Sequence, residues 1–292
     1  MSRPVLLLLP LYLLLSTASL PAAAEQAGNT ADERPYIETS YLQAPRQAGG
    51  FSLQASSYDP ANKYAGAGFR YTSDDHPGLR IDLYVYPAGR MTPAEALQVG
   101  MRDLRASMAH AKAQGSYSQL RELGEATFAL PAGPTAGTAP ANDFDARVIA
   151  TIAAIEQVEG RKLQLQLSLP PRELPMHSNA YLFYKQLYWL KLRASAAQQD
   201  IDQDRFNALA DRAARELVPA LQVAHVGSCA SAQINVPADA PDEEAALELV
   251  RQITVHQSLN CHQDAGKAVS AQQRLDHDIV EIAFSAQDWK SQ

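Results

Sequence analysis

Basic residues are in deficit in this sequence, and they form no run. The 292 residues carry 25 Lys and Arg against 32 Asp and Glu, which gives a net charge of −7 at pH 7. Proteins that bind nucleic acid need a basic surface that replaces the counterions of the phosphates. The charge balance therefore excludes nucleic acid as the expected partner.

Common catalytic signatures are also missing. The sequence contains no G-x-S-x-G elbow, no S-x-x-K pair, no H-E-x-x-H helix and no Walker loop. These motifs carry the chemistry of the common hydrolases and nucleotide-binding proteins. Their absence favours a non-catalytic protein without a cofactor, although residues that are distant in sequence can still assemble a catalytic site.

The sequence has no long apolar stretch after residue 24, and the one apolar stretch before residue 24 is short. Arg3 is the only charge before Glu25, and Val5 to Leu20 is almost wholly apolar. A basic start and a short apolar core, followed by three alanines at 22–24, are typical of a cleavable secretory signal peptide over residues 1–24. We therefore expect a periplasmic or secreted protein that begins at Glu25 and has no integral membrane segment after processing.

Cysteine occurs only twice, at Cys229 and Cys261. In an oxidising compartment such a pair is most simply a disulfide, which would stabilise the chain by about 3–4 kcal/mol. The alternative is a metal-dependent site built from nearby residues, which are His256, His262, Asp264 and His277. Their spacing does not match the usual zinc motifs, so we predict the disulfide and no metal.

Alternating apolar residues predict a series of extended segments after a polar leader over 25–50. In Leu79 to Pro87 and in Arg161 to Leu169 every second residue is apolar, a period that places one face of a strand in a core. The extended segments are predicted over 51–58, 65–72, 79–87, 118–130, 143–155, 161–169 and 181–194.

Two long helices interrupt these segments. The first is capped by Thr92 and ends at Gly115, and the second runs from Asp202 to Val218. The order β-β-β-α-β-β-β-β-α predicts an α+β fold over 51–223, with helices packed on an antiparallel sheet. Residues 227–292 predict a separate, small α+β unit that the disulfide holds together, with a strand over 230–236, a helix over 239–256 and an extended end over 279–284.

This order of elements resembles the sandwich of the PsbP-like and DcrB-like exported proteins. The resemblance is carried by Leu79–Tyr86 with the Thr92–Glu95 cap, and by Tyr188–Arg193 with the helix Phe206–Leu217. It covers about residues 50–223 and contains no diagnostic motif. Members of that fold are mostly non-enzymatic accessory or binding proteins, and this is what the resemblance implies.

Aromatic residues supply the candidate binding site. Tyr84 and Tyr86 lie on the polar face of their predicted strand, and Tyr181 and Trp189 lie in the last predicted strand. If these faces adjoin, they form a patch that can stack on a glycan or hold a partner protein. The alternative is that a helix covers the aromatic rings as part of the core.

Taken together, these features favour a non-catalytic envelope protein that binds an unknown protein or envelope component. An immunity-type inhibitor of a toxin is one example of this class. The alternatives are an envelope hydrolase or metal-dependent enzyme that uses the histidines of the C-terminal unit, and a purely structural oligomer.

Overall fold

The computed structural model describes residues 34–288, which belong to one compact unit. The predicted signal peptide and the first part of the polar leader lie outside the described residues. Within residues 34–288 we find no helix with the length and apolar character that crossing a membrane requires.

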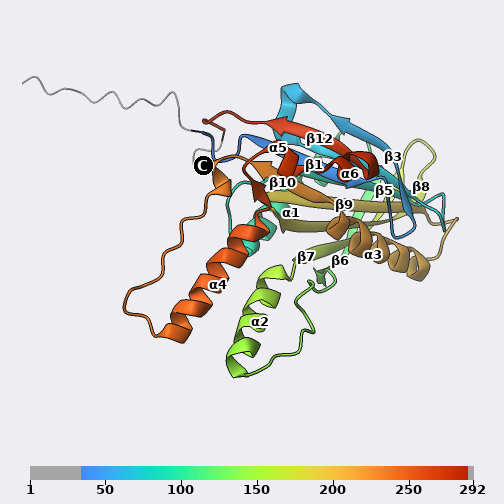
Figure 1. Ribbon diagram of the computed structural model, residues 1–292. Coiled ribbons are helices and arrows are strands. Elements are labelled where there is room, and N and C mark those ends of the chain that lie inside the picture. Colours follow the sequence, from blue (N-terminus) through green and yellow to red (C-terminus); the bar gives the residue numbers. More distant parts are fainter. Residues whose placement is uncertain (1–33, 289–292) are drawn as a thin grey trace, which may run out of the picture. The chain divides into compact units, whose positions relative to one another are not determined.

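A large antiparallel sheet is the centre of this α+β fold (Figure 1). Its eight strands follow the order β2-β3-β4-β5-β9-β8-β7-β6. They are β2 (Gln47–Ala48), β3 (Phe51–Tyr58), β4 (Ala67–Ser73), β5 (Arg80–Pro87), β6 (Gln119–Ala129), β7 (Glu159–Leu169), β8 (Leu174–Lys185) and β9 (Tyr188–Ala197). A short 3₁₀ helix, Pro60–Ala65, joins β3 to β4.

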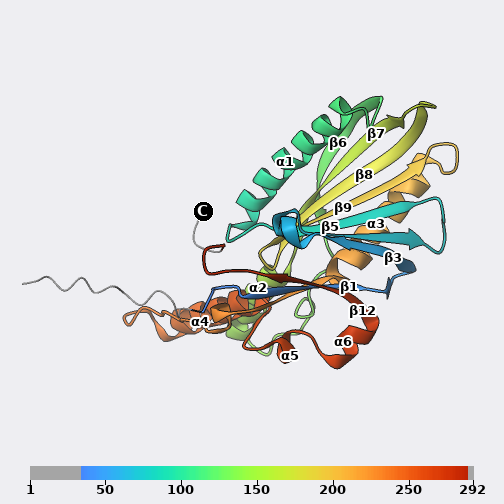
Figure 2. The ribbon, with the colours of Figure 1, turned by 90° about the horizontal axis from the view of Figure 1, so that it is seen from above.

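Two long helices cover opposite faces of this sheet. Helix α1 (Pro93–Ala113) begins with a capping box between Thr92 and Glu95, as the sequence predicts. Its apolar stripe packs on β7 and β8, where Leu163 and Leu165 face it. Helix α3 (Gln203–Ala220) begins at the cap Asp202 and packs on β8 and β9 from the other side (Figure 2).

A second sheet combines both ends of the described chain. Its strands follow the order β11-β10-β1-β12 and are β1 (Thr39–Pro45), β10 (Gln222–Val226), β11 (Cys261–His262) and β12 (His277–Ala283). Strand β1 lies in the middle, paired antiparallel with β10 and with β12. Its inner face, with Leu42 and Ala44, shares the main core with the large sheet, and its outer face holds Tyr41.

This second sheet corrects two predictions. The polar leader over 25–50 is wrong from residue 39 onward, because β1 is a central strand buried on both faces and therefore shows no simple alternation. The segment 227–292 does not build a sheet of its own, since β11 and β12 pair with β10 and β1. The predicted strand over 230–236 is also absent, because a 3₁₀ helix, Ser228–Ala230, is followed by irregular chain.

The C-terminal segment nevertheless contains the predicted helix and disulfide. Helix α4 (Asp242–Ser258) is followed by α5 (Ala265–Ala268) and α6 (Ala271–Asp276), which leads directly into β12. Cys229 and Cys261 are bonded, with a Cα–Cα separation of 5.9 Å.

Residues 143–155 form a helix instead of the predicted strand. Helix α2 (Asp143–Glu156) is capped by Asn142, whose side chain accepts a hydrogen bond from the backbone N–H of Asp145. The cap and the acidic first turn outweigh the β propensity of the valine and isoleucines that follow. Helix α2 packs against α4, and the two helices lie side by side in Figure 1.

The predicted segment 181–194 is a hairpin of two strands, β8 and β9. The turn between them contains Gln186 and Leu187, which have φ values of 53° and 64°. Such left-handed residues are usually Gly or Asn, so the turn has no obvious mark in the sequence. The number of strands between α1 and α3 is still the predicted four, because the extra strand of the hairpin replaces the one lost to α2.

Candidate functional site

Three of the four predicted aromatic site residues come together on the large sheet. In the register of β5 and β9, Tyr84 lies opposite Lys191 and Tyr86 lies opposite Trp189. The rings of Tyr86 and Trp189 are 5.5 Å apart between centroids. We call this surface the basic aromatic face, and its members are Tyr84, Tyr86, Trp189, Lys191, Arg193, Tyr117, Arg70, Arg80 and Asp82.

Lys191 lies at the centre of the basic aromatic face. Its Nζ is 5.0 Å from the ring centroid of Tyr84 and 5.5 Å from that of Tyr86, which is the geometry of a cation–π contact. Burial, and next the positive charge of Arg193, lower the pKa of Lys191. Among residues 34–288, no carboxylate lies within ion-pair distance of its Nζ.

The charges around Lys191 are mainly positive. Arg193 lies with its guanidinium 5.0 Å from the ring centroid of Tyr117, to whose hydroxyl it donates a hydrogen bond. The carboxylate among its members is Asp82, which accepts hydrogen bonds from Arg70 at 2.9 Å and from Arg80 at 2.6 Å. The face as defined thus has four cations and one carboxylate, and a second carboxylate, that of Asp103 in α1, acts on Tyr86.

Two tyrosines of this face, Tyr84 and Tyr86, keep their protons at neutral pH. Burial, and next the carboxylate of Asp103, raise the pKa of Tyr86 to about 12. Burial, and next Asp82, also raise the pKa of Tyr84. Both hydroxyls can therefore donate hydrogen bonds to a bound acceptor.

Helix α1 borders the basic aromatic face without covering it. The helix packs mainly on β8 and β7, while the face lies over β9, β5 and β4 (Figure 2). Trp189 marks the border, because its indole N–H donates a hydrogen bond of 2.8 Å to the carbonyl of Ala96 in α1. Tyr84, Tyr86 and Trp189 are all half-buried. The sequence leaves open a helix that covers the aromatic rings as the alternative to an open patch. Of these rings, only that of Trp189 donates a hydrogen bond to α1.

Tyr181 does not belong to this face. It points to the opposite side of β8, where it is fully buried and its ring lies 5.0 Å from that of Phe128. Its hydroxyl donates a hydrogen bond to Asp211 in α3. The prediction for Tyr181 is wrong because the hairpin turn before β9 sets the facing of β8, and the sequence does not show that turn.

The proposed metal-binding residues do not converge. His256 is on α4, His262 bonds to the side chain of Asn260, Asp264 caps α5 and His277 begins β12. Within the described part of the chain, no group of three or more His, Cys, Asp and Glu side chains could hold a metal ion.

A serine–histidine pair is present but closed to solvent. The Oγ of Ser40 and the Nδ1 of His225 are 2.8 Å apart, and the Nε2 of His225 lies 2.9 Å from the carbonyl oxygen of Gln186. If Nε2 donates to this carbonyl, Nδ1 accepts the proton of Ser40, which is how a base activates a nucleophile. Both side chains have an exposed fraction of 0%, so no substrate can reach the hydroxyl.

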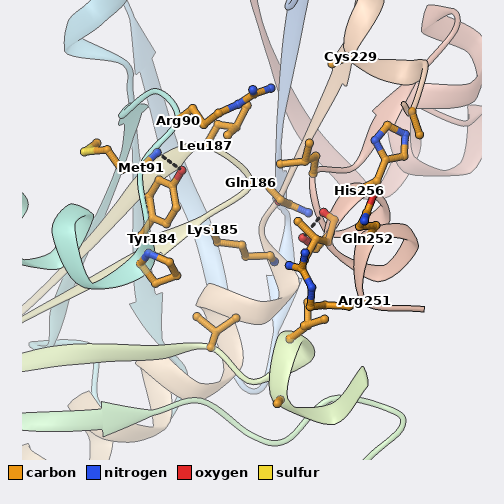
Figure 3. A pocket seen from close by; sticks show the side chains of 18 of the residues that line it. Arg90, Met91, Tyr184, Lys185, Gln186, Leu187, Cys229, Arg251, Gln252 and His256 are labelled. Carbon is orange, nitrogen blue, oxygen red and sulfur yellow. Dashed lines mark hydrogen bonds between the residues drawn. The ribbon is translucent and has the colours of Figure 1, made fainter. Parts of the chain in front are cut away.

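A large cavity lies near this pair, and the sequence does not reveal it. It has a volume of about 1030 Å³, at the upper end of the range of small-molecule sites. Its walls are the loop before α1, the β8–β9 turn, the end of α2, and α4 with the chain that precedes it (Figure 3). We call it the Lys185 cavity, because the side chain of Lys185 lies across its centre in Figure 3.

Lys185 is a cation without a carboxylate partner among residues 34–288. Its Nζ donates hydrogen bonds to the carbonyl oxygens of Leu221, at 3.0 Å, and Pro219, at 3.4 Å, which follow or end α3. Burial lowers the pKa of Lys185 to about 8, so the ammonium is still mostly charged at neutral pH.

No known protein-family profile and no curated protein matches this chain. Among solved structures, it is similar to the solution structure of cyanobacterial PsbP (CyanoP) from Synechocystis, with 10% sequence identity and a TM-score of 0.34. The matched part covers 64% of this chain and 93% of that chain. The similarity is weak and concerns the fold alone. The resemblance to PsbP-like proteins that the sequence suggests is likewise one of fold.

The sequence gives partial signals for these two sites. The basic aromatic face follows from the alternation in β5, which correctly places Tyr84 and Tyr86 on one side. Lys191 and Arg193 alternate in β9 in the same way, a signal that a search for aromatic residues alone overlooks. The cavity has no such signal, because its walls come from six stretches that are distant in sequence.

Proposed function

We propose that the protein is a non-catalytic binding protein of the cell envelope, and that its basic aromatic face holds an acidic segment of a partner protein. The observation that carries this proposal is the charge of the face. Four of its members are cations and one is a carboxylate, and the cations remain in excess when Asp103 is counted, although the chain as a whole has a net charge of −7. A local reversal of charge on an acidic protein selects for an anionic partner.

The residue types favour a protein over an uncharged glycan. Arg and Tyr are enriched where proteins bind each other, since they combine a large contact area with hydrogen bonds. Lys191 already occupies one side of both tyrosine rings, which reduces the ring surface left for stacking on a sugar. A neutral glycan would also leave all four cations without new partners.

Two observations support the non-catalytic part of the proposal. The serine–histidine pair is closed to solvent, and the histidines of the C-terminal segment lie apart. An immunity-type inhibitor is one kind of protein that acts only by binding its partner.

The envelope location rests on the predicted signal peptide and is supported by the disulfide. We expect the mature protein in a periplasmic extract to begin at Glu25. Mass spectrometry of the intact protein measures this directly. A mass that still includes residues 1–24 would contradict the location.

Site-specific photo-crosslinking in cells tests the partner. A photoreactive residue at Tyr84 is expected to capture a protein whose crosslinked segment is acidic, whereas the same residue at Leu275, which is 70% exposed on α6, is not. The double variant Lys191→Gln, Arg193→Gln should lose the crosslink. The control Lys267→Gln should keep it, because Lys267 is an exposed lysine on α5.

The wild-type protein provides a second measurement that does not depend on variants. Adding 0.5 M salt before illumination should weaken the crosslink, since salt screens contacts between exposed charges. The proposal fails if positions 84 and 275 capture the same proteins. It also fails if the double variant, once shown to be folded by circular dichroism, crosslinks as well as wild type.

A further inference from the structure

The lining of the Lys185 cavity combines apolar side chains with cations. The apolar side chains come from α2, α4 and the chain between them, and they include Ile155, Val158, Ile234, Val255 and Leu259. The cations are Lys185 at the end of β8, Arg90 before α1 and Arg251 on α4. A cavity with an apolar wall and a few polar groups is the usual form of a small-molecule site.

The cations of this cavity differ in how far their charges are already satisfied. Arg251 pairs with Glu248 at 2.6 Å, and the guanidinium of Arg90 lies 4.5 Å from the ring centroid of Tyr36. Lys185 has only the two carbonyl oxygens at the end of α3 as hydrogen-bond acceptors among the described residues. An ammonium has three N–H donors, so one of them remains for a ligand.

The lining contains only one carboxylate, that of Glu159, which is exposed at the end of the cavity formed by β7. Three cations and one carboxylate therefore give the lining a positive formal charge. Keeping Lys185 charged in a half-buried place is unfavourable unless an anion or a dipole compensates it. The carbonyls provide part of this compensation, and a bound anion would provide the rest.

We propose that the Lys185 cavity binds an amphipathic acid, with the anionic head at Lys185 and the apolar chain along the wall formed by α2 and α4. The head is a single carboxylate or an acid of similar size. The volume of about 1030 Å³ accommodates a medium-length alkyl chain together with its head. This site is separate from the basic aromatic face, so the two proposals stand or fall independently.

A series of probes with the same alkyl chain and different heads tests the proposal. Decanoate, decanol and decyltrimethylammonium are each titrated against the wild-type chain in the presence of a fluorescent apolar dye, and displacement of the dye is measured. We expect decanoate to bind at least tenfold more tightly than decanol. Decyltrimethylammonium should bind more weakly than decanol, because its charge has the same sign as that of Lys185.

Three variants locate the binding. Lys185→Met should weaken decanoate at least tenfold and leave decanol unchanged, since only the head loses a partner. Lys267→Met is the control, because Lys267 is an exposed lysine on α5 that does not line the cavity, and it should bind both probes as wild type does. Ala154→Trp should block both probes, because Ala154 is exposed on α2 and lines the cavity.

The variant Lys185→Met also removes two hydrogen bonds to the end of α3, so its folding is checked by circular dichroism. If it does not fold, Ala154→Trp and the order of the three probes still decide the question. Equal binding of decanoate and decyltrimethylammonium by the wild-type chain would overturn the proposal. So would unchanged binding of decanoate by a folded Lys185→Met or Ala154→Trp variant.

Discussion

Acidification is expected to destabilise the protein through the buried imidazole of His225. This side chain belongs to β10 and is fully buried. It contacts Ser40 and the β8–β9 turn, and it stacks on the ring of Tyr188. Burial lowers the pKa of His225 from 6.5 to about 4. In the unfolded chain the imidazole regains its ordinary pKa and binds a proton more readily than in the folded protein.

The sign and size of the effect follow from this difference. Because the unfolded state binds more protons between pH 6.5 and pH 4, the free energy of unfolding falls as the pH falls through this window. The contribution of His225 decreases by about 2 kcal/mol between pH 7 and pH 5, and by about 3 kcal/mol at pH 4. Carboxylates titrate over part of the same range, so a variant is needed to isolate the histidine.

Urea unfolding of wild type and His225→Gln at pH 7, 5 and 4 measures this contribution. The variant is expected to be less stable at pH 7, and its disadvantage should shrink by about 2 kcal/mol at pH 5. His110→Gln is the control, because His110 is exposed on α1 and its substitution should leave the curve parallel to wild type. Parallel curves for wild type and His225→Gln would refute the reasoning, as would an NMR titration of His225 with a midpoint near pH 6.5.

Three further substitutions test the packing. Leu165→Asp should destabilise the fold by several kcal/mol in urea unfolding, because it places an unpaired charge under α1, whereas Gln166→Asp on the other side of β7 should change stability little. Gly160→Ala should cost about 1–3 kcal/mol, since the added Cβ would lie 2.4 Å from a backbone oxygen of β8, and a melting temperature equal to that of wild type would contradict this close approach. The double variant Cys229→Ser, Cys261→Ser should lower the free energy of unfolding by about 3–4 kcal/mol for a sequence separation of 32, and an unchanged urea midpoint would contradict this stabilisation.

Regions with a clear periodicity could be predicted from the sequence. The strand over 51–58 has the predicted ends, and the helix after Thr92 begins at its capping box. In both cases the signal is local, because it lies in the alternation of neighbouring residues or in the residues of one helical turn. The disulfide was also predictable, since the chain offers only one possible pair.

The errors arose where the decisive contacts lie far away in sequence. The residues of α2 are an apolar run that suits a strand or a helix, and the run alone does not decide between them. Strand β1 pairs on both sides with strands that follow it by more than a hundred residues, and it is buried on both faces, so its sequence resembles that of an irregular segment. The facing of Tyr181 depends on a hairpin turn without glycine.

The position of β1 also determines when folding can be completed. As the chain is synthesised, β1 is the first strand of residues 34–288 to emerge, but its two neighbours in the sheet begin at Gln222 and His277. The second sheet therefore cannot close until almost the whole described chain has been made, and β1 remains unpaired during that time. A chain whose first strand needs its last strand stays incompletely folded while it is translated. This delay is compatible with the export that we propose, in which the polypeptide crosses a membrane unfolded and folds on the other side.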